Sequence, residues 1–431
     1  MVDYGTIMKK ILLTTALIGT VLMAEVPPLK PVNSRTFTQS QYIPDISLVL
    51  DASLVARDKK QEELGTLGIP GLSQSFFTGH SHDGHEHGAL NSNNGFNFNY
   101  AELVLSSNVD PYFSMDAVFH FSEEGVEVEE GYFTTSALGH GFRVRGGKFL
   151  SELGRMNSQH HHTWDFSDAP LIYTSFLGAE GLNDLGLQLH YVLPTETYLM
   201  VGLEAMQGRS ETSFGNESID INGTTVTSPT PPSLAIAYIK SSIDVGDTTI
   251  LPGFSYAHGT TRTHHNHDGH DEAFSGQTSL YNAELTIKHY FNSYSFVQWQ
   301  SEWMMRYKKG DAMHVELTGL ETKDQTIKQS GLYTQLIYAQ DQNWRYGLRY
   351  DSIYQNEFSF QEESLPSTPY QRYTGMVEYH FSEFSRLRLQ YDYNDAVYGE
   401  NETTHTLEQQ STQTIMLSFN LSIGAHAAHS F

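Results

Sequence analysis

Two histidine-rich tracts are the parts of this chain best suited to chemistry. Their metal-ligand candidates are His80, His82, Asp83, His85 and His87 in the first tract, and His264, His265, His267, Asp268 and His270 in the second. Imidazole nitrogens with interspersed carboxylates suit Zn²⁺ and, by the usual affinity order, Cu²⁺ and Ni²⁺. Each tract holds an HDGH tetrad, whose glycine lets the backbone turn tightly enough to bring flanking histidines onto one ion. Because such low-complexity tracts collect ions rather than hold one rigidly, we predict metal collection, with incidental polar sequence as the alternative.

A third cluster is the triplet His160, His161 and His162, followed by Trp164 and Asp165. Metal binding by the triplet and Asp165 is one interpretation, and packing of the histidines against Trp164 is the other. The sequence has no Gly-x-Ser-x-Gly or His-Glu-x-x-His motif, and no serine–histidine pair stands out. His162 with Asp165 does not by itself indicate a catalytic dyad. We therefore predict that the chain is not an enzyme and requires no cofactor, with a divalent metal ion as its bound or transported ligand.

The charge balance argues against nucleic acid as a partner. The chain has 431 residues, with 25 basic and 50 acidic side chains and a net charge of −25 when histidine is neutral. Phosphates require basic patches, whereas an acidic chain with 21 histidines concentrates cations. The chain has no cysteine, so disulfide bonds play no part in the argument.

The N-terminus predicts export from the cytoplasm. Lys9 and Lys10 precede an apolar run over 11–23 and then Ala24, the pattern of a signal peptide. Met8 is an alternative start, because the sequence from Met8 forms a complete signal peptide by itself. The run is too short for a lasting membrane helix, and no other run approaches the ~20 residues that a spanning helix needs. The predicted regions are a signal peptide over 1–24, an N-terminal periplasmic segment over 25–45 and a β-barrel over 46–431.

The C-terminal seventeen residues have a period of two. Their apolar face consists of Ile415, Leu417, Phe419, Leu421, Ile423, Ala425, Ala427 and Phe431. Successive side chains of a strand point to opposite sides, so this pattern predicts a strand with one lipid-facing side. At a C-terminus and after a secretory leader, it is typical of the closing strand of a bacterial outer-membrane barrel, which the barrel-assembly machinery recognises. The alternative is an amphipathic strand of a soluble sandwich.

Similar alternation recurs along the chain and predicts an all-β transmembrane barrel of about 16 antiparallel strands. The strands are expected near 46–56, 96–107, 111–122, 126–136, 141–152, 184–193, 197–207, 232–243, 248–258, 278–290, 294–307, 326–339, 343–355, 370–381, 385–395 and 412–431. Near Tyr100 the alternation changes phase, which suggests a β-bulge.

The connections alternate between short and long, as in barrels with short periplasmic turns and long external loops. The long connections are 57–95, 154–183, 208–231, 259–277, 308–325, 356–369 and 396–411, and Glu123–Gly125 is a very short exception. This parity places both chain ends on the periplasmic side. It also sends all three histidine segments to the external face.

The third external loop, 154–183, is predicted to fold inward and narrow the pore, as in general porins. Strand side chains that alternate with lipid-facing residues should line a wet lumen. The predicted pore-lining residues are Arg143, Arg145, Arg345, Arg349, Arg386, Arg388, Glu204, Glu284 and Glu378. An acidic, imidazole-bearing loop opposite an arginine wall would sort solutes by charge and dipole. The alternative is that the arginines only pair with lumen carboxylates such as Asp351 and Asp392, and both descriptions can hold together.

Four stretches carry a resemblance to a known family. They are IPDISLVLDASLVARDKKQEE, GHSHDGHEHGALNSNNGFNFNYAELVLSS, VDPYFSMDAVFHFSEEGVEVEEGYFTT and GKFLSELGRMNSQHHHTWDFSDAPLIYTSFLGAEGLND. They resemble Gram-negative outer-membrane proteins labelled zinc-regulated and TonB-dependent-receptor-like, mainly over 44–190. The resemblance implies metal-linked uptake through the segments His80–His87 and Gln159–Phe166. A TonB-dependent transporter needs about 22 strands around a plug, for which this chain is too short, so a porin-like barrel without a plug domain is expected.

The sequence therefore predicts a channel for small solutes in the bacterial outer membrane, biased toward divalent metal ions, with zinc first, by external histidine loops. The alternatives are an occluded metal receptor or adhesin-type barrel, and a general porin with no metal preference. The expected partners are outer-membrane lipid, the barrel-assembly machinery and divalent metal ions, with a homotrimer as the porin-like arrangement.

Overall fold

The computed structural model describes residues 44–424, apart from 74, 78–80, 83–84, 87–89, 211, 268–269, 317–318, 361–364 and 402–405. For 81, 82, 85, 86, 265–267, 270 and 316 it describes the backbone alone. The chain divides into two units, 1–43 and 44–431, and every described residue belongs to the second. The predicted signal peptide and nearly all of the predicted periplasmic segment lie outside the described residues.

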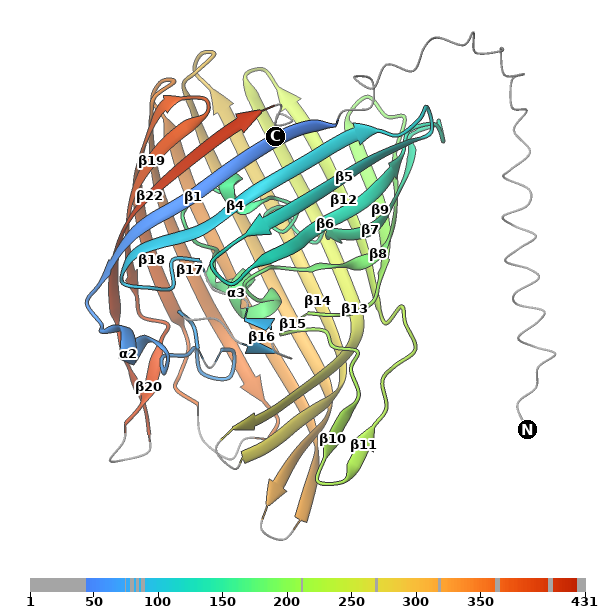
Figure 1. The fold of residues 1–431 in the computed structure, drawn as a ribbon, viewed down its shortest axis with the longest axis vertical. Coiled ribbons are helices and arrows are strands. Elements are labelled where there is room, and N and C mark those ends of the chain that lie inside the picture. The colour runs from blue at the N-terminus through green and yellow to red at the C-terminus, as the bar shows by residue number, and fades with distance from the viewer. Residues whose placement is uncertain are drawn as a thin grey trace, which may run out of the picture. The chain divides into compact units, whose positions relative to one another are not determined.

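The described residues form a closed antiparallel barrel in which each strand pairs with its neighbours along the chain (Figure 1). Its sixteen strands are β1 (Asp45–Arg57), β4 (Gly95–Asn108), β5 (Phe113–Phe121), β6 (Val126–Thr135), β7 (Phe142–Leu150), β8 (Asn183–Val192), β9 (Tyr198–Met206), β12 (Leu234–Val245), β13 (Thr248–His267), β14 (His270–Tyr290), β15 (Phe296–Glu316), β16 (Gly319–Ala339), β17 (Trp344–Phe358), β18 (Tyr370–Ser382), β19 (Ser385–Asn394) and β22 (Thr412–Gly424). The barrel closes where β1 pairs with β22, from Ser47 opposite Gly424 to Arg57 opposite Thr414. The predicted strand number and alternation are confirmed.

Alternation along each strand separates an apolar exterior from a polar interior. In β22, Leu417 and Ile423 are exposed, while Met416 and Ser418 are buried inside the barrel. The same pattern leaves many large apolar side chains exposed on the other strands, and Leu348 retains 67% of its accessible surface. A closed barrel satisfies every internal backbone group and meets lipid with this exterior, which is the outer-membrane solution to crossing a bilayer.

Two strand irregularities lie side by side near one end of the sequence. The pairing of β1 with β4 shifts where Asp51 faces Tyr100 and Ala52 faces Phe98, so Asn99 is the extra residue of a bulge. This confirms the predicted change of phase near Tyr100. The pairing of β5 with β6 shifts at Glu129 in the same way.

Two connections predicted as long loops are instead extensions of the strands. The segments 259–277 and 308–325 belong to two hairpins, β13 with β14 and β15 with β16, that project beyond the rest of the barrel (Figure 1). The prediction was wrong because it followed the alternation of apolar residues, which ends where a strand leaves the bilayer. The hydrogen bonds between the paired backbones continue beyond that point, although the side chains no longer alternate.

The third external connection, 151–182, folds into the lumen, as predicted. It carries a short 3-10 turn, η2 (His161–Thr163), and the helix α3 (Leu171–Leu177), which Figure 1 shows inside the barrel. Every residue of α3 except Thr174 is buried. Its apolar side chains join a cluster with Leu64 and Ile69 of the first connection. Leu64 is the last residue of the helix α2 (Gln61–Leu64), and Ile69 follows that helix.

Three small hairpins lie in the described parts of the first, fourth and eighth external connections. They are β2 (Ser81–His82) with β3 (His85–Glu86), β10 (Ile219–Ile221) with β11 (Thr224–Val226), and β20 (Tyr398–Glu400) with β21 (Leu407–Gln409). In the described part of the chain, no helix has the length and apolar character that crossing a bilayer requires.

Candidate pore constriction and histidine–carboxylate cluster

The third loop is held to the barrel wall through its residue Asp168. Its Oδ1 lies 3.0 Å from Nη2 of Arg349 and its Oδ2 lies 2.5 Å from Nη1 of Arg372. The Nε atoms of both arginines donate to Oδ2 of Asp351, at 3.0 and 3.2 Å. Burial alone would raise the pKa of Asp168, but the two guanidinium groups outweigh it and hold that pKa below its ordinary value of 3.8.

A second anchor is Glu302 of β15, which is almost fully buried. Its carboxylate accepts hydrogen bonds from the backbone N–H groups of Arg155 and Met156, at 3.0 and 3.2 Å. The hydroxyl groups of Tyr173 and Tyr333 donate to it at 2.7 and 2.6 Å. One wall carboxylate therefore binds both the start of the loop and its helix α3.

A third anchor joins the beginning of the loop to strands β9 and β12. Glu204 accepts hydrogen bonds from the hydroxyl of Ser151 at 2.6 Å and from the backbone N–H of Glu152 at 3.0 Å. The ammonium group of Lys240 lies 2.8 Å from the carboxylate of Glu152 and 3.9 Å from that of Glu284. Two of the predicted pore-lining carboxylates thus take part in this anchor. Glu204 binds the loop directly, and Glu284 lies near Lys240, which pairs with Glu152 of the loop.

The predicted arginine wall also contacts the loop. Arg386 donates to the backbone carbonyl of His162, and Arg388 donates to that of Trp164 at 2.8 Å. Both arginines pair with Glu378 as well, Arg388 at 2.6 Å. These arginines therefore pair with a wall carboxylate and also bind the loop, whereas the sorting of solutes by charge and dipole stays a prediction.

The remaining predicted pore-lining residues have separate environments. Arg345 lies 3.9 Å from Glu378 and remains one-third exposed. Arg145 stacks over the ring of Tyr132 at 4.5 Å, and Arg143 is exposed. The role of these side chains in a solute path stays a prediction.

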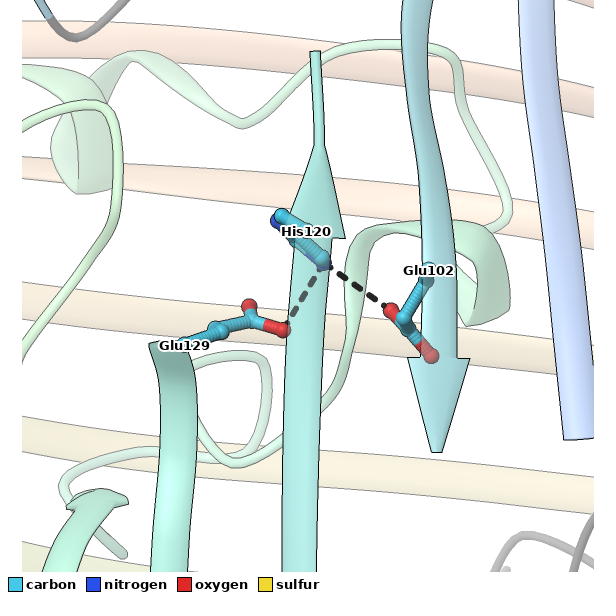
Figure 2. A group of neighbouring side chains, drawn as sticks. All are labelled: Glu102, His120 and Glu129. Carbon is cyan, nitrogen blue, oxygen red and sulfur yellow. Dashed lines mark hydrogen bonds and ion pairs between the residues drawn. The ribbon is translucent and has the colours of Figure 1, made fainter. Parts of the chain in front are cut away.

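A histidine and two glutamates from three neighbouring strands meet on the inner wall (Figure 2). Nε2 of His120 on β5 lies 3.1 Å from Oε2 of Glu102 on β4 and 2.8 Å from Oε2 of Glu129 on β6. The three candidate ligand atoms all lie within 4.8 Å of one another. The arrangement follows from register, because Glu102 pairs directly with His120 across the two strands.

Two histidines of the third loop reach the same carboxylates. Nδ1 of His160 lies 3.2 Å from Oε2 of Glu129 and 3.5 Å from Oε2 of Glu102. Nδ1 of His162 lies 3.3 Å from Oε2 of Glu102. We call these five residues, Glu102, His120, Glu129, His160 and His162, the histidine–carboxylate cluster.

The bulge in β6 explains why this wall carries so many carboxylates. At Glu129 the strand has one extra residue, so Glu129 and Glu130 can both turn toward the lumen instead of alternating. Oε2 of Glu130 lies 3.0 Å from Nε2 of His160, and Oε1 accepts a hydrogen bond from the backbone N–H of Leu150. Glu130 therefore holds the far side of the His160 ring.

Other predicted metal ligands are not brought to this cluster. His161 packs against Trp164 with ring centroids 4.5 Å apart, and burial lowers the pKa of His161 to about 4, so its ring is neutral. Asp165 accepts hydrogen bonds from Gln298 and Gln335, and burial raises its pKa.

The two long histidine tracts are described only in part. Nε2 of His264 lies 2.7 Å from Oδ1 of Asp271 across the β13–β14 hairpin. The structural placement of His80, Asp83, His87 and Asp268 lies outside the described residues, as do the side chains of His82, His85, His265, His267 and His270. Metal collection by the tracts stays a prediction.

Sequence reasoning missed Glu102, His120 and Glu129. The available signal was three polar residues at inward positions of three successive strands. Their convergence depends on strand register, which alternation alone does not specify.

The chain is similar to known proteins in sequence and in structure. No family model matches the chain. An uncharacterized protein of Aquifex aeolicus (strain VF5) is 42% identical over 399 residues, covering 92% of this chain and 81% of that protein. Among solved structures, the outer membrane channel DcaP of Acinetobacter baumannii aligns with a TM-score of 0.50 and 10% identity, over 89% of this chain and 99% of DcaP. The anion-selective porin of Comamonas acidovorans aligns with a TM-score of 0.49 and 10% identity, over 88% of this chain and 98% of the porin.

Proposed function

We propose that this outer-membrane β-barrel, which belongs to the same family as the uncharacterized Aquifex aeolicus protein, is a porin-like channel for small solutes. The observation that carries the proposal is the third loop crossing the lumen of a sixteen-stranded barrel, with Asp168 bound by Arg349 and Arg372. Barrels of 16 to 18 strands are wide enough for an aqueous channel. A loop anchored across such a lumen narrows the path and sets which solutes pass.

The finer part of the proposal is a preference for divalent metal ions, with Zn²⁺ first. Its support is the composition of the two histidine tracts and their topology. The tracts belong to the first and fifth external connections, at the same end of the barrel as the third loop. Many exchanging imidazoles would raise the local ion concentration without trapping the ion.

Single-channel conductance of the purified protein in a planar bilayer tests the channel. We expect stable open steps in KCl that micromolar Zn²⁺ modulates and a chelator restores. Steps that ignore Zn²⁺ would leave a general porin. The absence of steps would contradict the channel and favour an occluded receptor or adhesin.

One observation favours the alternative of an occluded barrel. Inside the barrel, Leu171 and Phe176 of the third loop are fully buried in one apolar cluster with Leu64 and Ile69 of the first connection. Apolar packing of this kind fills lumen volume rather than lining a wet path.

Growth at limiting zinc tests the metal preference. The tested variant replaces His80, His82, His85, His87, His264, His265, His267 and His270 by alanine, and we call it the tract-less variant. We expect weaker growth at limiting zinc with an unchanged KCl conductance, because the change removes ligands but leaves the lumen intact. Growth equal to that of the native protein would rule out collection by the tracts.

Assembly is the last part of the proposal. A homotrimer and insertion by the barrel-assembly machinery are the porin-like expectations. Cross-linking of the protein in its native membrane tests the homotrimer.

A further inference from the structure

The histidine–carboxylate cluster lies between the barrel wall and the third loop. Three members belong to β4, β5 and β6, and His160 and His162 belong to the loop. The side chain of Glu102 is completely buried, and those of Glu129, His120 and His160 are less than one-fifth exposed. We infer that Glu102, His120 and Glu129 form a binding site for one divalent transition-metal ion such as Zn²⁺, with His160 of the loop bonded to the two carboxylates.

Donor spacing is the first argument. Zn²⁺ binds histidine nitrogen and carboxylate oxygen at about 2.0–2.2 Å, so neighbouring ligand atoms in a tetrahedral or square arrangement lie roughly 2.8–3.6 Å apart. The nitrogen–oxygen separations from His120 are 3.1 and 2.8 Å, and the ligand atoms of Glu102, His120 and Glu129 all lie within 4.8 Å of one another. These spacings suit ligands that share one ion.

The hydrogen-bond pattern is the second argument. A ring nitrogen carries at most one proton, yet Nε2 of His120 faces two carboxylate oxygens and Nδ1 of His160 faces the same two. One N–H donates well to only one of them. A cation between Nε2 of His120 and the two carboxylate oxygens satisfies both contacts of that nitrogen at once, while His160 contacts the same carboxylates from the loop.

The support of the two carboxylates is the third argument. Carboxylates that bind a metal are usually hydrogen-bonded by further side chains. Here Nδ1 of His160 lies 3.5 and 3.2 Å from Glu102 and Glu129, and Glu130 holds its Nε2 at 3.0 Å. The ring of His120 is also held in place, because Tyr100 stacks on it at 4.8 Å.

The donor set specifies the class of ion. One imidazole nitrogen and two carboxylate oxygens suit Zn²⁺, Cu²⁺ or Ni²⁺, whereas Ca²⁺ and Mg²⁺ prefer oxygen alone. All three ligands come from the wall, so a bound ion joins β4, β5 and β6, and His160 connects two of these ligands to the third loop. This site is separate from the histidine tracts and does not depend on which solute the barrel conducts.

The test counts zinc in the tract-less variant, because the exposed tracts would otherwise add their own ions. The protein is stripped with EDTA, loaded with Zn²⁺, desalted and measured by elemental analysis. We expect one zinc per chain. Within that background, Glu102→Gln and His120→Ala should lose the ion, and the matched control His258→Ala, an exposed histidine that contacts Ser279, should keep it.

Glu130→Gln separates a metal site from a simple group of ion pairs. It leaves all three ligands in place but weakens the support of His160, which contacts two of them, so we expect one zinc per chain bound about 10–100-fold more weakly in chelator competition. A change in electrophoretic migration on heating verifies that the barrel of each variant has folded. The inference is overturned if the folded tract-less protein retains no zinc, or if Glu102→Gln and His120→Ala retain it.

Discussion

At the scale of single residues, the lumen is organised by buried charges that hold the third loop. Glu302 and Glu204 of the wall accept hydrogen bonds from backbone N–H groups at the start of that loop, and Asp168 of the loop binds Arg349 of the wall. A buried charge is stable only when it is paired and hydrogen-bonded, so removing one partner leaves the others uncompensated. These residues therefore decide where the loop lies.

Replacing Asp168 by asparagine should loosen the loop. The change removes the charge between Arg349 and Arg372, and hydrogen bonds to charged groups contribute about 1.5–3 kcal/mol. We expect a larger and noisier single-channel conductance and faster protease cleavage within 151–182. Asp324→Asn, at an exposed position, is the matched control and should behave as the native protein does.

The same aspartate predicts a pH dependence. Its pKa is held below 3.8, so its contribution to docking is complete above that value and is lost as the pH falls through the lowered pKa. Conductance should be steady from pH 7 to pH 5 and rise only below about pH 3.8. Asp168→Asn should lack this acid-dependent part. An equal rise in both proteins would show that other groups release the loop.

At the scale of elements, the helix α3 packs its apolar residues inside a barrel whose other inward positions are mostly polar. Phe176 is fully buried and lies under the guanidinium group of Arg306 at 4.9 Å. The barrel strands are held by their own hydrogen-bond ladders, which α3 does not join. The stability of the loop and that of the barrel are therefore separable.

Phe176→Ala should weaken loop docking without unfolding the barrel. Removing a buried phenylalanine side chain costs about 3–5 kcal/mol, because it leaves a cavity as well as lost apolar burial. We expect protease cleavage within the loop to increase while heat-modifiable migration of the barrel is unchanged. Leu203→Ala, on the exterior at 61% exposure, removes apolar volume away from the loop and should leave cleavage as it is. Loss of the barrel itself in Phe176→Ala would contradict this separation.

At the scale of the whole molecule, the exterior is built for lipid. Exposed aromatic side chains gather near the short-turn ends of the strands, among them Trp344, Tyr346 and Phe381. Aromatic girdles of this kind mark the bilayer interface, and the apolar band between them spans about 25 Å.

This orientation predicts a depth dependence for charged substitutions. Leu348 is exposed within β17 and several residues from the turn, whereas Val245 is exposed at the end of β12 beside a turn. Leu348→Arg should destabilise the barrel folded in a bilayer by about 2–4 kcal/mol, and Val245→Arg should destabilise it by about 0–1 kcal/mol. Denaturant unfolding in lipid vesicles measures both. Equal costs would contradict this placement of the bilayer.

How far the sequence determines the site depends on whether a feature is local. The inward positions of Glu204, Arg349 and Glu378 follow from strand alternation, and all three are found inside the barrel. Their partners could not be predicted, because Glu204 contacts Ser151 and Arg349 contacts Asp168 through long separations along the chain. Docking of a loop within a lumen depends on non-local packing that leaves no periodic signal.

By itself, the sequence determined the sixteen strands and their antiparallel order, whereas the inward third loop was expected by analogy with general porins. A period of two and alternating connection lengths are local properties, and each can be recognised without knowing its neighbours. Only the tertiary structure decided that Glu102, His120 and Glu129 meet, that a bulge turns Glu129 and Glu130 inward together, and that His160 reaches them from the loop. Register across strands and the path of a folded loop arise from contacts between distant segments, so they emerge only when the barrel closes.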